Sequence, residues 1–362
     1  MLTKTRRGLA ATAIAAAALT GVAACGSSSS SSNSGSDTPQ GTVRNALTSY
    51  QDGNALTVTV KLDASADDIK RLAASGDDPT NLTDAQAKAY ANGTIVFAVK
   101  TKDKSFKDAQ NDPDLTHSSF AFAVSTGNDK IVEFRFVDST FFARADVKTI
   151  AQLGGNDVGD IQSEADQLSS QLPFLKAALA GNWLKTSYND LNSIAKIAGG
   201  GGGLPSANPA QSQAFIKALL NVFDKDVTAT KADDNSDLGD HYVVSGSSRT
   251  IATDLVAALK QEFAGLPGAS DAFKDADPTQ VPDKTVKVDT YIKSGKVHAV
   301  KLDVAQFATG KDAAALGGKP FYVEFDFDSS ADISAPSGAT DIDLPSLVGK
   351  LGAGLGTSNQ AS

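Results

Sequence analysis

Repeated alternation of apolar and polar side chains is the feature that most constrains the fold of this chain. Residues 56–62 carry Leu or Val at every even position and Thr or Lys at every odd one. Similar alternation recurs in residues 95–99, 120–124, 132–136, 286–292, 300–304 and 321–327. A strand of this kind has one dry face and one solvated face. The pattern therefore predicts a sheet of many half-buried strands.

Short polar turns join some of these strands. Residues 125–130, Ser-Thr-Gly-Asn-Asp-Lys, separate two alternating runs, and Ser294–Gly295 separate two others. Such turns are typical of hairpins, and hairpins place their strands antiparallel. We therefore expect an antiparallel sheet.

Helical periodicity lies between the strands. Apolar side chains follow helical spacing in residues 161–179, where Pro173 should interrupt the helix, and again in 215–223 and 251–263. One-sided helices combined with one-sided strands indicate an α+β fold. The glycine run Gly199–Gly203 is interpreted as a loop within one domain, because neither half has enough strands for its own sheet. A linker between two domains is the alternative.

The N-terminus has the three parts of a secretory signal. Basic residues precede an apolar run from Leu9 to Val22, and Val22-Ala23-Ala24-Cys25 resembles the bacterial lipobox. Cys25 is the only cysteine, which makes this match specific. We expect residues 1–24 to be removed and Cys25 to be lipidated, so that the chain is held on the extracytoplasmic side of the cell membrane. A plain signal peptide is the alternative, and both Sec and twin-arginine export stay open.

The chain beyond the cysteine divides by composition. Residues 25–41 are rich in serine and predict a flexible tether that carries the lipidated Cys25. Residues 42–345 are predicted to fold as a domain, and residues 346–362 to form a flexible glycine-rich tail.

Charge and motifs exclude several classes of function. The formal net charge of -9 argues against a nucleic-acid partner, and one cysteine cannot form an internal disulfide. Motifs for zinc proteases, phosphate-binding loops, nucleophile elbows and dinucleotide binding are absent. Asp233, Asn235 and Asp237 have calcium-loop spacing, but glycine and glutamate do not follow at the required positions, so a solvated turn is favoured. We expect no enzyme, no cofactor and no metal.

Three local stretches resemble a known family. They are residues 138–146 (Asp-Ser-Thr-Phe-Phe-Ala-Arg-Ala-Asp), residues 181–184 (Gly-Asn-Trp-Leu) and residues 333–336 (Ile-Ser-Ala-Pro). Together with the order of lipobox, serine-rich tether, short helix near Thr42 and antiparallel hairpins, they resemble the LolA-like lipoproteins of actinobacteria, the LppX and LprG type. The resemblance covers most of residues 42–343, and none of its motifs is catalytic.

This resemblance implies a curved antiparallel sheet, a half-barrel, whose concave face is covered by helices over a cavity for acyl chains. The chain would then carry a lipid or glycolipid ligand. The residues expected to line the cavity lie on the dry faces of the predicted strands: Phe97, Phe120, Phe122, Phe134, Phe136, His298, Val300, Leu302, Val323 and Phe325.

Some alternatives stay open. The dry face would equally suit a filled core, which would make the chain an interaction or sensor lipoprotein with a protein partner. His298 is either a polar residue near a strand end or a hydrogen-bond donor to a lipid headgroup. Trp183, the only tryptophan, is expected to pack beneath the helices, and a membrane-facing rim is the second possibility.

Overall fold

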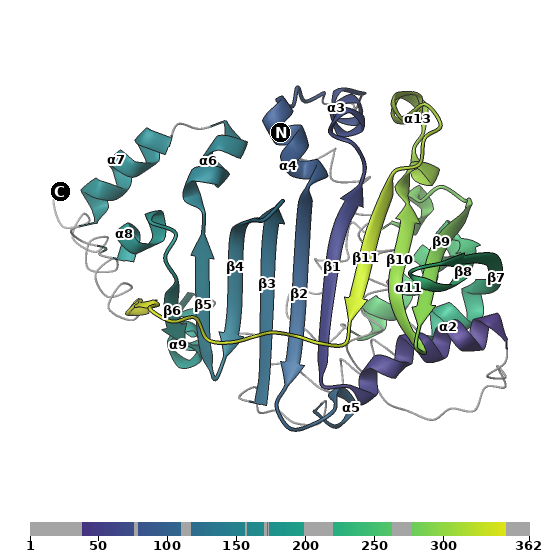
Figure 1. Cartoon of the computed structure of the whole chain (residues 1–362), viewed down its shortest axis with the longest axis horizontal. Coiled ribbons are helices and arrows are strands. Elements are labelled where there is room, and N and C mark those ends of the chain that lie inside the picture. The colour runs from purple at the N-terminus through teal and green to yellow at the C-terminus, as the bar shows by residue number, and fades with distance from the viewer. Residues whose placement is uncertain are drawn as a thin grey trace, which may run out of the picture. The chain divides into compact units, whose positions relative to one another are not determined.

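The computed structural model describes residues 38–75, 79–109, 117–155, 158–169, 172, 174–198, 220–262 and 277–344. Within them, twelve strands form one unclosed sheet, and every pair with a defined register is antiparallel except β12 with β6 (Figure 1). Helices precede, separate and follow the strands along the chain. The α+β fold class with a largely antiparallel sheet is therefore confirmed.

The described part of the chain forms two compact units, and each is built from separated stretches of sequence. The first unit contains strands in the neighbour order β1, β11, β10, β9, β8, β7, and the second contains β12, β6, β5, β4, β3 and most of β2. The units are therefore not the two halves that a linker at Gly199–Gly203 would join, and that glycine run lies outside the described residues.

The first unit, called unit 1 here, holds six strands and most of the helices that precede and follow them. Its strands are β1 (Ala55–Asp63), β7 (Val227–Ser236), β8 (Gly239–Ser247), β9 (Thr285–Lys293), β10 (Lys296–Asp303) and β11 (Tyr322–Asp328). Its helices are α2 (Pro39–Thr48), η1 (Ser49–Asp52), α3 (Ala66–Ser75), α4 (Asp84–Ala91), α5 (Phe106–Ala109), α11 (Ser248–Glu262), η3 (Pro278–Gln280), η4 (Val304–Phe307) and α13 (Gly310–Leu316).

Unit 2 contains the remaining elements. Its strands are β2 (Gly93–Thr101), of which Ile95–Lys100 belong to this unit, β3 (Ser118–Thr126), β4 (Asp129–Val137), β5 (Thr140–Ala145), β6 (Leu184–Ser187) and β12 (Thr340–Asp341). Its helices are α6 (Val147–Gly154), α7 (Val158–Leu168), α8 (Phe174–Leu179) and α9 (Tyr188–Ala198). As expected from Pro173, the apolar stripe of residues 161–179 is divided between two helices, α7 and α8.

Helix α2 begins earlier than the composition suggests. The Thr38 side chain accepts a hydrogen bond from the Gly41 amide, and Pro39 occupies the first helical turn, where its missing amide hydrogen has no cost. The Gln40 side chain donates to the main-chain oxygens of Phe223 and Val227, each at 3.1 Å. Helix α2 therefore begins three residues before the predicted boundary at Thr42, because the cap and the first turn are polar and resemble the tether in composition.

The core of unit 1 lies between α2 and the sheet. Helix α2 contacts β7, β9 and β10, and its buried side chains include Val43, Ala46 and Leu47. On the sheet, Val300 pairs with Phe325, which in turn pairs with Val60, so these residues share a face. Val300 is fully buried, with an exposed fraction of 0%.

The hairpin turns form where the sequence predicts them. Between β3 and β4, Gly127 has φ +58°, and between β9 and β10, Ser294 and Gly295 have φ +53° and +73°. A two-residue hairpin turn of this hand requires positive φ, which glycine adopts without strain. The region of Asp237 is likewise the turn of a hairpin, the one between β7 and β8.

Candidate functional site

One face of unit 2 gathers phenylalanine side chains from neighbouring strands. In the β3–β4 pair, Phe120 lies opposite Phe136, and Phe122 lies opposite Phe134. Since these residues alternate along each strand, all four side chains point to the same face of the sheet. Phe97 of β2 joins them, with its ring centroid 5.0 Å from that of Phe122. We call this surface the aromatic face.

The aromatic face continues onto β5 and α9 through two residues that the sequence analysis did not select. Phe141 pairs with Phe136, and their ring centroids are 4.7 Å apart. Tyr188, the first residue of α9, lies 6.4 Å from Phe141 in a stacked arrangement. Phe141, Ala143 and Ala145 do alternate, but this run of six residues is too short and too rich in alanine to give a clear strand signal.

Several side chains of the aromatic face are open to solvent. Phe97 is 50% exposed, Phe134 44% and Phe120 41%, and Ile95 beside them on β2 is 38% exposed. Phe136, at 3%, is buried beneath its neighbours. The sequence pattern predicts this face to be dry, so the exposure is a difference from expectation. Alternation shows which residues share a face, but it does not show what covers that face.

The other five residues of the predicted cavity lie in unit 1. Val300, Leu302 and Phe325 are 0%, 1% and 4% exposed and belong to the packed interior beneath α2. Val323 is half-buried and pairs with Leu62 and Leu302. The ten predicted residues thus fall into two groups, an aromatic group in unit 2 of which three members are exposed and a largely packed group in unit 1.

His298 is displaced from the rest of its group by a β-bulge. The pairing of β10 with β9 shifts between Val297 and Ala299, so the simple alternation that joins His298 to Val300 and Leu302 does not hold. His298 instead lines a recess of about 460 Å³ at the end of the β9–β10 hairpin. Thr57, Asp326 and Asp328 are among the polar side chains that line it with His298.

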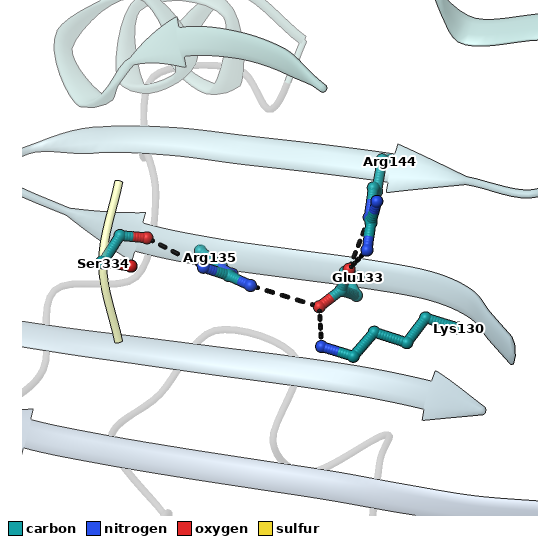
Figure 2. A network of polar contacts seen from close by, with 5 residues as sticks. All are labelled: Lys130, Glu133, Arg135, Arg144 and Ser334. Carbon is teal, nitrogen blue, oxygen red and sulfur yellow. Dashed lines mark hydrogen bonds and ion pairs between the residues drawn. The ribbon is translucent and has the colours of Figure 1, made fainter. Parts of the chain in front are cut away.

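The opposite face of unit 2 carries a buried acid. Glu133 of β4 is 3% exposed and receives hydrogen bonds from Lys130 at 2.8 Å, from Arg135 at 3.4 Å and from Arg144 (Figure 2). Burial alone would raise the pKa of Glu133, but the hydrogen bonds and charges of Lys130 and Arg144 outweigh it and hold the pKa below its usual value. The ionised form of Glu133 is therefore favoured, and it is held in place by these three side chains.

Other features of the predicted site lie beyond the described residues. Cys25 is one of them. In the part of the chain that the structure describes, no helix has the length and apolar character needed to span a bilayer. The same residues contain no cluster of three or more side chains suited to hold a metal ion.

Among the solved structures to which this chain is similar are two mycobacterial proteins. LprF from Mycobacterium bovis is 8% identical with a TM-score of 0.33, and the match covers 83% of this chain and 97% of LprF. The lipoprotein LppX from Mycobacterium tuberculosis is 7% identical with a TM-score of 0.30, covering 82% of this chain and 98% of LppX. No family model and no curated protein matches the chain. The solved structures are thus of the LppX and LprG type that the sequence resembles.

Proposed function

We propose that this chain is a membrane-anchored extracytoplasmic lipoprotein that binds a lipid or another apolar ligand on the aromatic face of unit 2. The exposure of Phe97, Phe120 and Phe134 on one continuous face carries this proposal. Extended apolar patches are uncommon on soluble proteins and usually mark a binding surface.

The hydrophobic free energy that binding could gain on this face supports a ligand with hydrocarbon chains. Burying one phenylalanine side chain contributes roughly 1.5–3 kcal/mol, so three exposed rings leave several kcal/mol available to a partner. Polar groups are few among the aromatic side chains, so recognition there would rest on apolar contact. An acyl chain lying across β2, β3 and β4 would gain this energy without needing hydrogen bonds.

Binding of a fluorescent fatty acid tests the proposal. The protein is purified without detergent, and probe affinity is compared between the parent and the double variant Phe97→Ser/Phe134→Ser. We expect the variant to bind at least tenfold more weakly, because two exposed rings are lost from the face while the folded core is unchanged.

Tyr90→Ser is the matched control. Tyr90 on α4 is 54% exposed but belongs to unit 1, so its removal deletes an exposed aromatic ring elsewhere. It should leave probe affinity at the parent value. Equal affinity of the double variant and the parent would rule out the aromatic face as the ligand site.

A protein partner is the second candidate function. The burial of Val300, Leu302 and Phe325 favours it, since these side chains pack into the core of unit 1. An apolar face of the same kind also suits a protein interface. Parent protein that binds no acyl probe and yields no lipid on extraction would favour this second function.

A further inference from the structure

A group of cations surrounds Trp183 on the polar face of unit 2. The guanidinium carbon of Arg135 lies 5.0 Å from the indole centroid, and that of Arg144 lies 4.9 Å from it. Arg135 comes from β4 and Arg144 from β5, and Trp183 directly precedes β6. Trp183 is half-buried, and its indole ring packs against both guanidinium groups.

The charge of this group is positive in an acidic chain. Lys130, Arg135 and Arg144 all pair with one carboxylate, Glu133 (Figure 2), and nearby Lys185 pairs with Asp341 at 3.3 Å. Four cations thus meet two carboxylates, whereas the whole chain has a formal net charge of -9. Glu133 is buried, but the side chains of the four cations keep exposed fractions of 47%, 20%, 35% and 35% in sequence order.

Part of this arrangement has a structural role. Arg135 donates a hydrogen bond to the main-chain oxygen of Ser334 at 3.0 Å, and the Thr340 amide donates to the Trp183 oxygen at 2.8 Å. These contacts hold the segment that leads to β12. They use one guanidinium nitrogen of Arg135 and the backbone of Trp183, and they involve neither Lys130 nor Lys185 nor the indole ring.

We propose that this surface docks onto a membrane surface that carries anionic lipid headgroups. We call it the tryptophan–arginine face, and it consists of Lys130, Arg135, Arg144, Trp183 and Lys185. Tryptophan is favoured at the boundary between water and hydrocarbon, and arginine and lysine attract acidic headgroups. Charge complementarity is what identifies the partner.

Membrane docking and ligand binding would use opposite sides of strand β4. Glu133 and Arg135 alternate with Phe134 and Phe136, so the tryptophan–arginine face and the aromatic face lie on opposite sides of the sheet. A membrane docked on the first would leave the second open. The inference therefore does not depend on the proposed function.

Vesicle binding tests the docking. The chain from residue 25 onward, with Cys25→Ser so that no acyl chain is attached, keeps every described residue. It is titrated with vesicles of phosphatidylcholine alone and of phosphatidylcholine with phosphatidylserine. Trp183 is the only tryptophan, so its emission reports this face directly. We expect a blue shift and quenching by brominated lipid with the anionic vesicles only, both reversed by salt.

Two double-lysine variants with the same change in net charge test whether binding depends on the tryptophan–arginine face or only on the total charge of the protein. Lys130→Gln/Lys185→Gln should weaken partitioning onto anionic vesicles at least tenfold, since each basic residue near such a surface contributes measurably to binding. Lys107→Gln/Lys231→Gln is the control, because these lysines are 48% and 55% exposed, are also ion-paired with aspartates, and lie in unit 1. The control should bind like the parent, and circular dichroism checks that both variants fold.

Several outcomes would overturn the docking. They are an unchanged Trp183 emission with anionic vesicles, equal binding to phosphatidylcholine alone, and equal loss of binding in the two lysine variants. An emission change produced to the same extent by inorganic phosphate would also overturn it, because the site would then be one for a small anion.

Discussion

At the residue scale, valine and phenylalanine occupy contrasting environments in this sheet. Val300 of β10 has no exposed surface, while Phe97 of β2 is half open to solvent. Both lie at apolar positions of alternating strands, so the sequence pattern predicts the same burial for both. Packing, and not hydropathy, decides what a larger side chain would do at each position.

We predict that Val300→Trp lowers the free energy of unfolding by about 1–3 kcal/mol or more, because it overpacks the core beneath α2. Phe97→Trp should change that free energy by no more than about 0.5 kcal/mol, since its site is half exposed. Urea unfolding followed by circular dichroism measures both. Unchanged stability of Val300→Trp would mean that unit 1 contains free space at this position and that the cavity extends there.

At the element scale, α2 depends on residues that look like tether. Thr38 caps the helix, and the Gln40 side chain donates hydrogen bonds to the main-chain oxygens of Phe223 and of Val227, the first residue of β7. Loss of a cap costs about 1 kcal/mol, and loss of hydrogen bonds to buried carbonyl groups costs a similar amount each.

A chain that begins at Thr42 should therefore melt several degrees lower than one that begins at Asp37. Both lack the serine-rich residues, so the difference isolates Asp37 to Gly41. Differential scanning calorimetry compares them with the chain from residue 25. Equal melting temperatures of all three would show that the first turn of α2 adds nothing to the stability of unit 1.

Strands β1, β2, β3, β4, β9, β10 and β11 could be predicted because each carries several alternating apolar positions, and glycine marks the turns of the β3–β4 and β9–β10 hairpins. The long strand β7 could not, because polar residues dominate its sequence. Strands β5, β6 and β12 could not, since they are short, and two-residue β12 exists only through pairing with β6. The bulge at His298 could not be predicted either, because a register shift depends on the neighbouring strand β9. Five phenylalanines of the candidate site were found, but their exposure was not, since it depends on how the whole unit packs.

At the scale of the whole molecule, attachment to a membrane would rest on Cys25. In a bacterial host that processes lipoproteins, we predict that Cys25→Ser moves the protein from the membrane pellet to the supernatant after a high-salt wash, because acyl anchoring resists salt whereas surface charge does not. Ser30→Ala, in the same segment, should stay in the pellet. A Cys25→Ser protein that still pellets in high salt would disprove the lipid anchor.

The buried acid of β4 has a consequence for how this sequence can vary. Conventional substitution scoring would treat Phe134 as essential and Glu133 as a tolerant surface position. In the folded chain, the buried Glu133 carboxylate forms ion pairs with three cations, whereas Phe134 is 44% exposed. Selection for folding alone would therefore retain glutamate at position 133 and tolerate many different residues at position 134. In a saturation library sorted for folded protein, position 133 should be nearly invariant and position 134 diverse, so a phenylalanine kept at position 134 among natural variants would record selection for something other than stability.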